Sequence, residues 1–320
     1  MTVMVTGGAG YIGSHVVTAL LAAGRTVLVV DDLSTGRRES VPDVPLVRLD
    51  LADPGCVPVL AEAARANRVG AVVHLAAKKR VDESVARPLW YSEQNVGGLT
   101  NLLHALVVAQ VRDVVFSSSA AVYGSTGPDP VTEQHPTAPV NPYGRTKLVG
   151  EWLLQDCARA HGLRTVSLRY FNVAGAAQRR LADHGTGNLV TATVAALRRG
   201  DAPRVFGTDY DTPDGTCVRD FVHVQDVAEA HLAALDGLAS AAPPPSVLNV
   251  GTGRGTSVAQ VVERLSDLAG RPGSARFEGR RVGDPPAVVA CVDQIGDHLG
   301  WRARHTLDDM LLSAWQSASA

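Results

Sequence analysis

The sequence predicts an α/β fold built on a doubly wound parallel sheet. Through the first half of the chain, short runs rich in β-branched residues alternate with longer segments of helical periodicity. Several of these runs are apolar at consecutive positions, which is typical of strands covered on both faces. A glycine-rich turn directly follows the first run. Repeated strand–helix units of this kind form parallel sheets with right-handed crossovers.

The predicted elements follow one another in a regular order up to about residue 174. Strands are expected at 3–6, 26–30, 44–49, 71–76, 113–117 and 165–170, and helices at 12–23, 88–109 and 143–160. The later part is less regular, with a helix at 189–199, a turn-rich segment at 207–215, a strand at 247–250 and a helix at 258–269. We therefore expect a nucleotide-binding domain at 1–173, with a return segment near 220–252, and a smaller C-terminal α/β substrate domain formed mainly by 174–320.

Composition narrows the class of protein. Hydrophobic residues make up 45% and charged residues 19% of the 320 residues, and the net charge is -2. This balance suits a globular enzyme and gives no electrostatic reason to expect nucleic acid or a membrane surface as a partner. The four cysteines are far apart and lack metal-ligand spacing, and a strand-like run begins at Thr2. We expect free thiols, no metal, no signal peptide, no membrane span and a cytoplasmic location.

The glycine-rich turn indicates a dinucleotide site. Gly7, Gly10 and Gly13 follow the first strand and open the first helix. Glycine permits the tight turn, the approach of backbone N–H groups to a pyrophosphate, and close packing of helix on strand. The positive end of the helix dipole then faces the phosphates. These residues predict a Rossmann-type sheet.

Carboxylates at two strand ends refine this expectation. Asp31 ends the second strand, close to the roughly 20-residue spacing of a residue that binds the adenosine ribose. A carboxylate there repels a 2′-phosphate, so the sequence favours NAD over NADP. Asp50 and Leu51 follow the third strand, where they could flank the adenine.

A tyrosine and a lysine supply a candidate catalytic pair. Tyr143 and Lys147 are four residues apart, so on a helix they lie on one face. A free phenol has a pKa of about 10. We expect the Lys147 ammonium and the positive charge of oxidised nicotinamide to lower the pKa of Tyr143. A fall of about three units corresponds to roughly 4 kcal/mol.

Three hydroxyls end the strand that precedes this pair. Ser117, Ser118 and Ser119 lie where sheets of this kind bind ligands, beyond the carboxyl end of a strand. One of them could pass a proton between a substrate hydroxyl and Tyr143. Any of the three could act, and we favour Ser119 because it is the last and therefore the nearest to the crevice.

Together these residues resemble the extended short-chain dehydrogenase/reductases, and in detail the UDP-glucose 4-epimerase (UDP-galactose 4-epimerase) family. The resemblance runs through nearly the whole chain. The most telling stretches are 7–15, 117–124, 141–147, 169–172, 206–224 and 280–284. The run at 214–221 is similar to the epimerase version in particular.

The resemblance implies a role for each matching residue. The catalytic residues are Ser119, Tyr143 and Lys147. The cofactor-binding residues are Gly7, Gly10, Tyr11, Ile12, Gly13, Asp31, Asp32, Asp50, Leu51, Lys79, Asn95 and Tyr170. The substrate-binding residues are Phe171, Asn172, Asn188, Phe206, Arg219, Arg281, Asp284 and Val288. The two arginines suit a diphosphate because a guanidinium binds its oxygens in a planar fork.

The resemblance also implies a reversible 4-epimerisation of UDP-glucose and UDP-galactose. Tyr143, through Ser119, removes the proton of the C4 hydroxyl, and hydride passes to NAD. The resulting 4-keto sugar turns over while UDP stays bound, and hydride then returns to the opposite face. A homodimer is expected, through the helices at 88–109 and 143–160.

Other functions fit the sequence less well. A nucleotide-sugar 4,6-dehydratase commonly carries Asp-Glu directly after the active hydroxyl, where this chain has Ala120 and Ala121. A non-catalytic NAD-sensing protein would be expected to lose the pair of Tyr143 and Lys147. The substrate could also be a UDP-N-acetylhexosamine or another UDP-sugar.

Three positions depart from the family pattern. Ala121 replaces a residue that often carries a second hydroxyl. The stretch from Asn188 to Thr191 only partly follows the usual uridine-binding segment. Val288 falls at a position that resembles the family's sugar gate, where a bulky aromatic side chain restricts the pocket to plain hexoses. Because valine is small, we expect N-acetylated UDP-hexosamines to fit as well.

Overall fold

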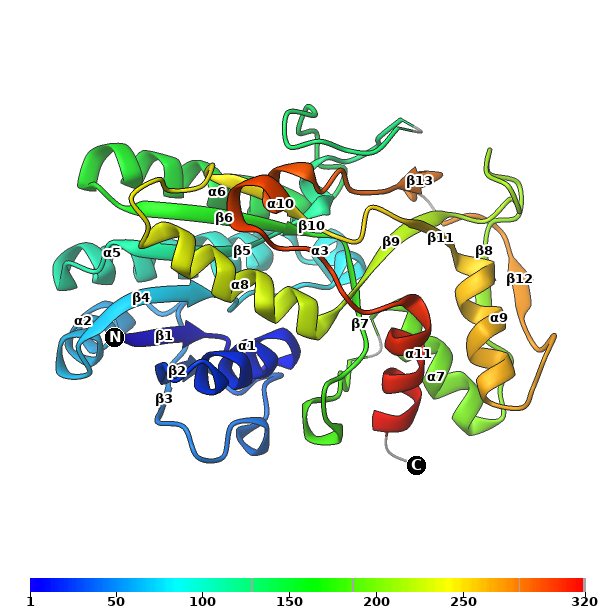
Figure 1. The fold of residues 1–320 in the computed structure, drawn as a ribbon, viewed down its shortest axis with the longest axis horizontal. Coiled ribbons are helices and arrows are strands. Elements are labelled where there is room, and N and C mark those ends of the chain that lie inside the picture. Colours follow the sequence, from blue (N-terminus) through cyan, green and yellow to red (C-terminus); the bar gives the residue numbers. More distant parts are fainter. Residues whose placement is uncertain (128, 186, 282, 319–320) are drawn as a thin grey trace.

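A parallel sheet forms the centre of the molecule. The computed structural model describes residues 1–127, 129–185, 187–281 and 283–318. Within these residues the sheet has seven strands in the order β10-β6-β5-β4-β1-β2-β3 (Figure 1). They are β1 (Thr2–Thr6), β2 (Thr26–Asp31), β3 (Leu46–Arg48), β4 (Val69–His74), β5 (Asp113–Ser119), β6 (Arg164–Tyr170) and β10 (Val247–Val250). The predicted doubly wound sheet is confirmed, and the strand expected at 247–250 lies at its edge.

Helices cover both faces of this sheet, which explains the consecutive apolar residues of its strands. Val3 and Val5 point into a core shared with α1 (Tyr11–Ala22) and α8 (Val224–Leu238). Met4 points into the core on the opposite face. The helices there are α2 (Cys56–Ala66), α5 (Gly98–Ala109) and α6 (Pro142–His161). Neither α2 nor α8 was among the predicted elements.

The predicted helix at 88–109 is interrupted by a π-helical segment. It consists of α4 (Pro88–Tyr91), the π-helical Ser92–Gly97 and α5. The wider turn holds Asn95 in a buried position, where its amide oxygen accepts from the Lys78 backbone N–H at 2.8 Å. Its amide nitrogen donates to the Thr146 hydroxyl of α6 at 3.0 Å. Asn95 therefore ties the end of β4 to the helix that carries Tyr143 and Lys147. Single-turn π segments often occur at functional sites.

The C-terminal part forms smaller sheets beside the carboxyl edge of the central one (Figure 1). β9 (Val218–His223) pairs with β7 (Asn172–Ala174), β11 (Gly255–Ser257) and β13 (Ala287–Val288). β8 (Arg204–Phe206) pairs with β12 (Arg276–Glu278). Helices α7 (Leu189–Arg199), α9 (Val258–Leu268) and α11 (Leu307–Ser317) pack around a third core. β9 runs directly into α8, so one segment connects this part to the central sheet.

Candidate functional site

The turn after β1 is built so closely that two of its glycines have no room for a side chain. Gly7 has a φ of +72°, and a Cβ on it would lie 2.6 Å from the Ala76 backbone nitrogen. A Cβ on Gly13 would lie 2.1 Å from the Gly7 carbonyl oxygen. Tyr11 and Ile12 begin α1, and no side chain caps the helix. Its N-terminal N–H groups can therefore bind an anion, as a dinucleotide pyrophosphate requires.

Two adjacent carboxylates lie at the end of β2, and they differ in environment. The Asp31 oxygens accept from the backbone N–H groups of Ala9 and Leu33, both at 2.9 Å. Burial raises the pKa of Asp31. Burial acts in the same direction on Asp32, but hydrogen bonds from Ser34 and the charge of Lys78 together hold its pKa below the usual value.

The lysine beside these carboxylates is Lys78, which the sequence analysis did not select. Its Nζ lies 3.2 Å from Asp32 Oδ2. The expected Lys79 is 60% exposed, and its Nζ lies 3.9 Å from Asp183 and 5.7 Å from the centre of the Tyr11 ring. The sequence shows only two consecutive lysines after β4. Side chains do not alternate regularly in a loop, so the sequence could not indicate which of the two lies beside the carboxylates.

The two residues predicted beside the adenine lie after β3. Asp50 is exposed and accepts from the Ala52 N–H at 2.9 Å. Leu51 is buried, and its carbonyl oxygen accepts from the Asn101 side chain at 2.8 Å.

Ser119, Tyr143 and Lys147 come together at the carboxyl end of β5. The Ser119 hydroxyl lies close enough to the Tyr143 phenol to lower its pKa, and it accepts from the Ala121 N–H at 3.1 Å. Lys147 Nζ donates to the Ser117 carbonyl oxygen at 2.7 Å and lies 5.9 Å from the centre of the Tyr143 ring. Because side chains alternate along a strand, Ser118 points to the other face. The structure thus places Ser119, and not Ser118, beside Tyr143.

Local contacts set the start of α6 against the serine strand. The Asn141 side chain caps the helix by accepting from the Gly144 N–H at 2.8 Å, and Pro142 occupies the first turn, as is common at a helix start. A Cβ on Gly144 would lie 2.5 Å from the Ala121 carbonyl oxygen. Glycine at this position therefore allows α6 to approach the segment that follows Ser119.

The pKa of Tyr143 depends on burial as well as on the charges around it. Burial raises the pKa of Tyr143, and the hydrogen bond from Ser119 opposes this effect. Burial also lowers the pKa of Lys147 to about 7, and the charge of Glu151 opposes this effect. The prediction places both groups at a partly buried site beside the positive charge of oxidised NAD, so it stays a prediction for the enzyme with its cofactor.

Three consecutive predicted residues lie where β6 ends and β7 begins. The Tyr170 hydroxyl lies 2.6 Å from His231 Nε2, and burial raises the pKa of Tyr170. Phe171 belongs to a small buried cluster, and Val288 of β13 packs against the same cluster. Asn172 is exposed at the start of β7. Phe171 and Val288 therefore lie in one apolar group beside the segment that follows Ser119.

The remaining predicted residues lie in the C-terminal part. The Arg281 guanidinium lies 3.9 Å from the centre of the Phe206 ring. Arg219 donates to the Pro285 carbonyl oxygen at 2.8 Å, and its other terminal nitrogen is 3.7 Å from Asp284. Val282, inside the predicted stretch 280–284, lies outside the described residues.

Asn188 uses its side chain within the protein. Its amide oxygen caps α7 by accepting from the Thr191 N–H at 2.8 Å, and its amide nitrogen donates to Asp183 at 2.7 Å. Asn188 also lines a pocket of about 370 Å³ together with Tyr11, whose hydroxyl donates to the Gly175 carbonyl oxygen at 2.5 Å.

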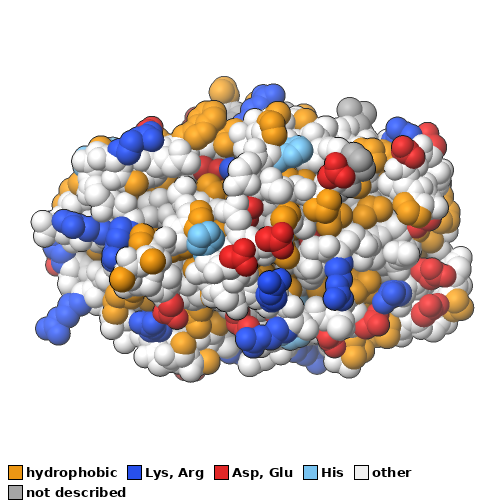
Figure 2. Space-filling model, turned by 45° about the horizontal axis from the view of Figure 1, so that its top comes forward, with side chains coloured by type: hydrophobic (Ala, Val, Ile, Leu, Met, Phe, Trp, Pro, Cys, Tyr) orange, Lys and Arg blue, Asp and Glu red, His pale blue; other side chains and the backbone are white. Residues whose placement is uncertain are grey.

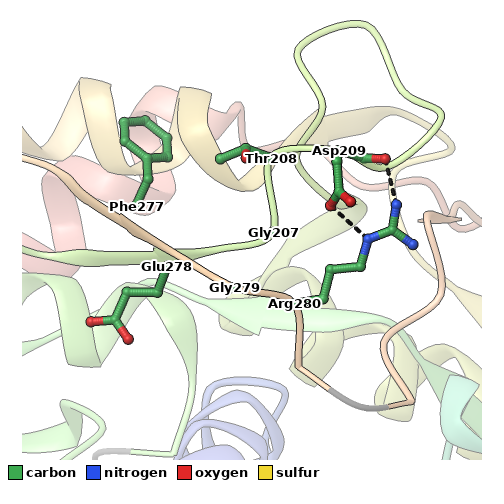
Figure 3. A pocket seen from close by; sticks show the side chains of 7 residues that line it. All are labelled: Gly207, Thr208, Asp209, Phe277, Glu278, Gly279 and Arg280. Atoms are coloured by element: carbon green, nitrogen blue, oxygen red, sulfur yellow. Dashed lines mark hydrogen bonds and ion pairs between the residues drawn. The ribbon is translucent and has the colours of Figure 1, made fainter.

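A second pocket, of about 460 Å³, lies next to Phe206 and Arg281 (Figure 3). Its walls are residues 207–209 after β8 and 277–280 at the end of β12. Figure 3 shows Arg280 turned towards Asp209, and their Nε and Oδ1 atoms are 2.6 Å apart. This pocket was not predicted from the sequence, in which only the turn-rich stretch at 207–215 points to it.

Three further properties of the described residues concern surface charge, metal ligands and membrane-spanning helices. Figure 2 shows acidic and basic side chains interspersed over the visible face. In the described part of the chain, no three His, Cys, Asp or Glu side chains are grouped as a metal site would need. Nor does any helix found there have the length and apolar character needed to cross a bilayer.

Comparisons with known proteins agree with this geometry. The NAD dependent epimerase/dehydratase family model matches residues 3–251. The UDP-glucose 4-epimerase of Azospirillum brasilense is 48% identical over 318 residues, which cover 98% of this chain and 90% of that protein. The crystal structure of UDP-glucose-4-epimerase from Stenotrophomonas maltophila, with bound NAD and formylated UDP-arabinopyranose, is 40% identical. It superposes with a TM-score of 0.93 over 99% of this chain and 97% of that one.

A second solved structure gives the same result. UDP-glucose 4-epimerase from Brucella ovis, in complex with NAD, is 40% identical, with a TM-score of 0.92 over 98% of this chain and 97% of that one. This chain therefore belongs to the NAD dependent epimerase/dehydratase family, among its UDP-glucose 4-epimerases.

Proposed function

We propose that the protein is an NAD-dependent isomerase that interconverts UDP-glucose and UDP-galactose by reversible epimerisation at C4 of the hexose. The observation that carries this proposal is the meeting of Ser119, Tyr143 and Lys147 at the carboxyl end of β5. The glycine turn opens at the same edge of the sheet. The relatives and solved structures named above support the same reaction.

The residues present fit NAD as the cofactor. The crowded turn of Gly7 and Gly13, with the uncapped start of α1, suits a pyrophosphate. When bound, NAD supplies the oxidation and the later reduction at the sugar carbon and is unchanged after one turnover. The residues that would hold it are Gly7, Gly10, Tyr11, Ile12, Gly13, Asp31, Asp32, Asp50, Leu51, Lys79, Asn95 and Tyr170, and we add Lys78 because it pairs with Asp32.

Tyr143 is the proposed general base and acid. Burial raises the pKa of Tyr143, and the positive charge of oxidised NAD beside the ring would favour the phenolate. Ser119, beside the phenol, relays the proton of the C4 hydroxyl to Tyr143 and back again. Lys147 stays fixed by the Ser117 carbonyl oxygen.

The C-terminal part, mainly 174–320, is the proposed UDP-sugar-binding domain. A hexose that must turn over needs its nucleotide held firmly, and guanidinium groups bind a diphosphate well. Arg219 and Arg281 are proposed to bind the diphosphate together with Asn172, while Phe206 lies at the uracil, and Asn188 and Asp284 lie near the uridine. Phe171 and Val288, which share one apolar cluster, are proposed to line the hexose pocket.

A homodimer in the cytoplasm is proposed from exposed apolar side chains and from the cysteines. Leu89 of α4 is 79% exposed, Val85 of α3 (Val81–Ala86) is 64% exposed and Trp152 of α6 is 53% exposed. Both α3 and α4 pack against α6, so these side chains belong to neighbouring helices. Exposed apolar side chains on neighbouring helices suit an interface. All four cysteines, which lie in the described part of the chain, are free thiols, as a reducing compartment favours.

The proposed reaction is tested by approaching equilibrium from both sides. Purified protein is incubated separately with UDP-glucose and with UDP-galactose, and the products are resolved by chromatography and weighed by mass spectrometry. An epimerase brings both reactions to the same mixture without a change of mass. A product that has lost one water would instead identify a dehydratase and overturn the proposal.

A further inference from the structure

The serine run carries a second arrangement on the face away from the substrate. Ser118 is buried, and its hydroxyl donates to Glu151 Oε1 at 2.5 Å. Arg169 of β6 donates its Nε to the same oxygen at 2.9 Å and a terminal nitrogen to Oε2 at 2.6 Å. The residues Ser118, Glu151 and Arg169 are all at most 5% exposed. We call these three residues the Glu151 clamp.

The clamp joins the elements that carry the catalytic residues. Ser118 precedes Ser119 on β5, and it lies opposite Arg169 in the register of β5 and β6. Glu151 follows Lys147 by four residues on α6, so both lie on the same side of the helix. Three charge-assisted hydrogen bonds from two strands therefore fix the rotation of α6 about its axis. That rotation determines where Tyr143 and Lys147 point.

The clamp also places a buried negative charge one helical turn from Lys147. Burial lowers the pKa of Lys147 to about 7, and Glu151 acts to raise it. Two donors from Arg169 and one from Ser118 hold the Glu151 carboxylate in place. Among the described residues, the other groups facing Lys147 are the Ser117 carbonyl oxygen and the Phe116 ring of β5, His74 of β4 and Tyr143 of α6. The Arg169 charge lies behind Glu151, with the Tyr123 ring 4.7 Å from its guanidinium.

We propose that Glu151 is a positioning residue of the active site: held by Ser118 and Arg169, it keeps Lys147 in place and positively charged beside Tyr143. Glu151 does not itself touch the substrate, because it lies on the opposite face of β5 from Ser119. The catalytic consequence rests on the proposed epimerase function. The charge on Lys147 can be measured without it.

The test uses the scarcity of lysine in this chain. Lys78, Lys79 and Lys147 are the only lysines in the sequence, so ¹³C-lysine-labelled protein gives few Cε signals to follow with pH. The variants Lys78→Arg and Lys79→Arg identify the other two. The charge is removed without leaving Arg169 unpaired in the double variant Glu151→Met with Arg169→Met. The amide pair, Glu151→Gln with Arg169→Gln, removes the same charge if the methionine pair does not fold.

We expect the pKa of Lys147 to fall by about one unit or more in either double variant, since an adjacent opposite charge shifts a pKa by roughly 1–3 units. The alkaline limb of the kcat profile should move to lower pH by the same amount, so kcat on that limb falls about tenfold per unit. KM for UDP-glucose should be unchanged. The control Glu263→Gln, an exposed residue of α9, should leave the Lys147 signal at its wild-type titration.

The outcomes separate this inference from the proposed reaction. A Lys147 titration that is unchanged in folded double variants overturns the inference, whether or not the protein is an epimerase. A lowered pKa of Lys147 together with an unmoved pH profile of kcat also overturns it, because the charge would then have no part in turnover. A lowered pKa in a protein that converts no UDP-sugar supports the electrostatic role and rejects the proposed function instead.

Discussion

Replacement of Gly13 by alanine tests whether the turn after β1 is shaped for a cofactor. The added Cβ would lie 2.1 Å from the Gly7 carbonyl oxygen and 2.8 Å from the Gly8 Cα, whereas ordinary contact begins at 3.4 Å. These are backbone atoms, so the turn has to move by more than 1 Å. Overpacking of this kind typically costs about 1–3 kcal/mol. For a chain of this size we expect the melting temperature to fall by a few degrees.

The displaced atoms belong to the proposed pyrophosphate site, so NAD should be lost as well. We expect the affinity for NAD to fall at least about tenfold, which corresponds to ~1.4 kcal/mol. The assay measures the NAD content of the purified protein after heat release, and the melting temperature with and without added NAD. The matched control is Gly296→Ala in α10 (Asp293–Leu299), where the added Cβ meets only the end of the Arg302 side chain, at 3.2 Å. That substitution should be neutral or stabilising by about 0.4–1 kcal/mol. If Gly13→Ala keeps the NAD content and the melting temperature of the control, the reasoning about the turn is refuted.

Three further predictions concern the substrate and pH. Arg281→Ala should raise KM for UDP-glucose about tenfold or more, as loss of a charged hydrogen bond does, while Arg204→Ala, in β8, should not; equal effects would contradict the assignment. Val288→Tyr should abolish turnover of UDP-N-acetylglucosamine but keep that of UDP-glucose. If wild-type protein has no measurable kcat/KM for the acetylated sugar, the hypothesis that Val288 admits such sugars is rejected. Burial lowers the pKa of His74 to about 3 and of His231 to about 4. The unfolded chain therefore binds protons that the native state excludes, and stability present above about pH 6.5 is lost as the pH falls towards 4, by about 1.4 kcal/mol per unit for each histidine. Buried carboxylates with raised pKa values oppose this loss of stability in part. Equal urea midpoints at pH 7 and pH 5 would show that the histidines do not control acid stability.

The sequence was sufficient for the central sheet because its signals are local. The consecutive apolar residues of β1 reflect cores on both faces, and Gly7 marks the turn that follows. Its place as the last of three serines was enough to favour Ser119 from the sequence. The sequence could not show that Ser118 holds Glu151, because those residues are 33 positions apart and meet only in the packed fold.

The C-terminal part was less predictable for a physical reason. Its strands are short, and β13 has only two residues, so no periodic pattern develops. β9 pairs with partners that lie about 35 to 70 positions away in the chain, and pairing at that range leaves no local signature. The strength of burial around Tyr143 and Lys147, which raises the pKa of the first and lowers that of the second, cannot be read from their spacing in the sequence.

The central claim is that Tyr143 drives epimerisation with a cofactor that stays bound. The most direct measurement incubates purified protein with UDP-glucose and no added NAD, and follows UDP-galactose by chromatography for wild type and for Tyr143→Phe. The account predicts conversion to a fixed mixture by the wild type, and loss of conversion in a variant that keeps the wild-type melting temperature and NAD content. Conversion at the wild-type rate by Tyr143→Phe, or no conversion by folded wild type even when NAD is added, would contradict it.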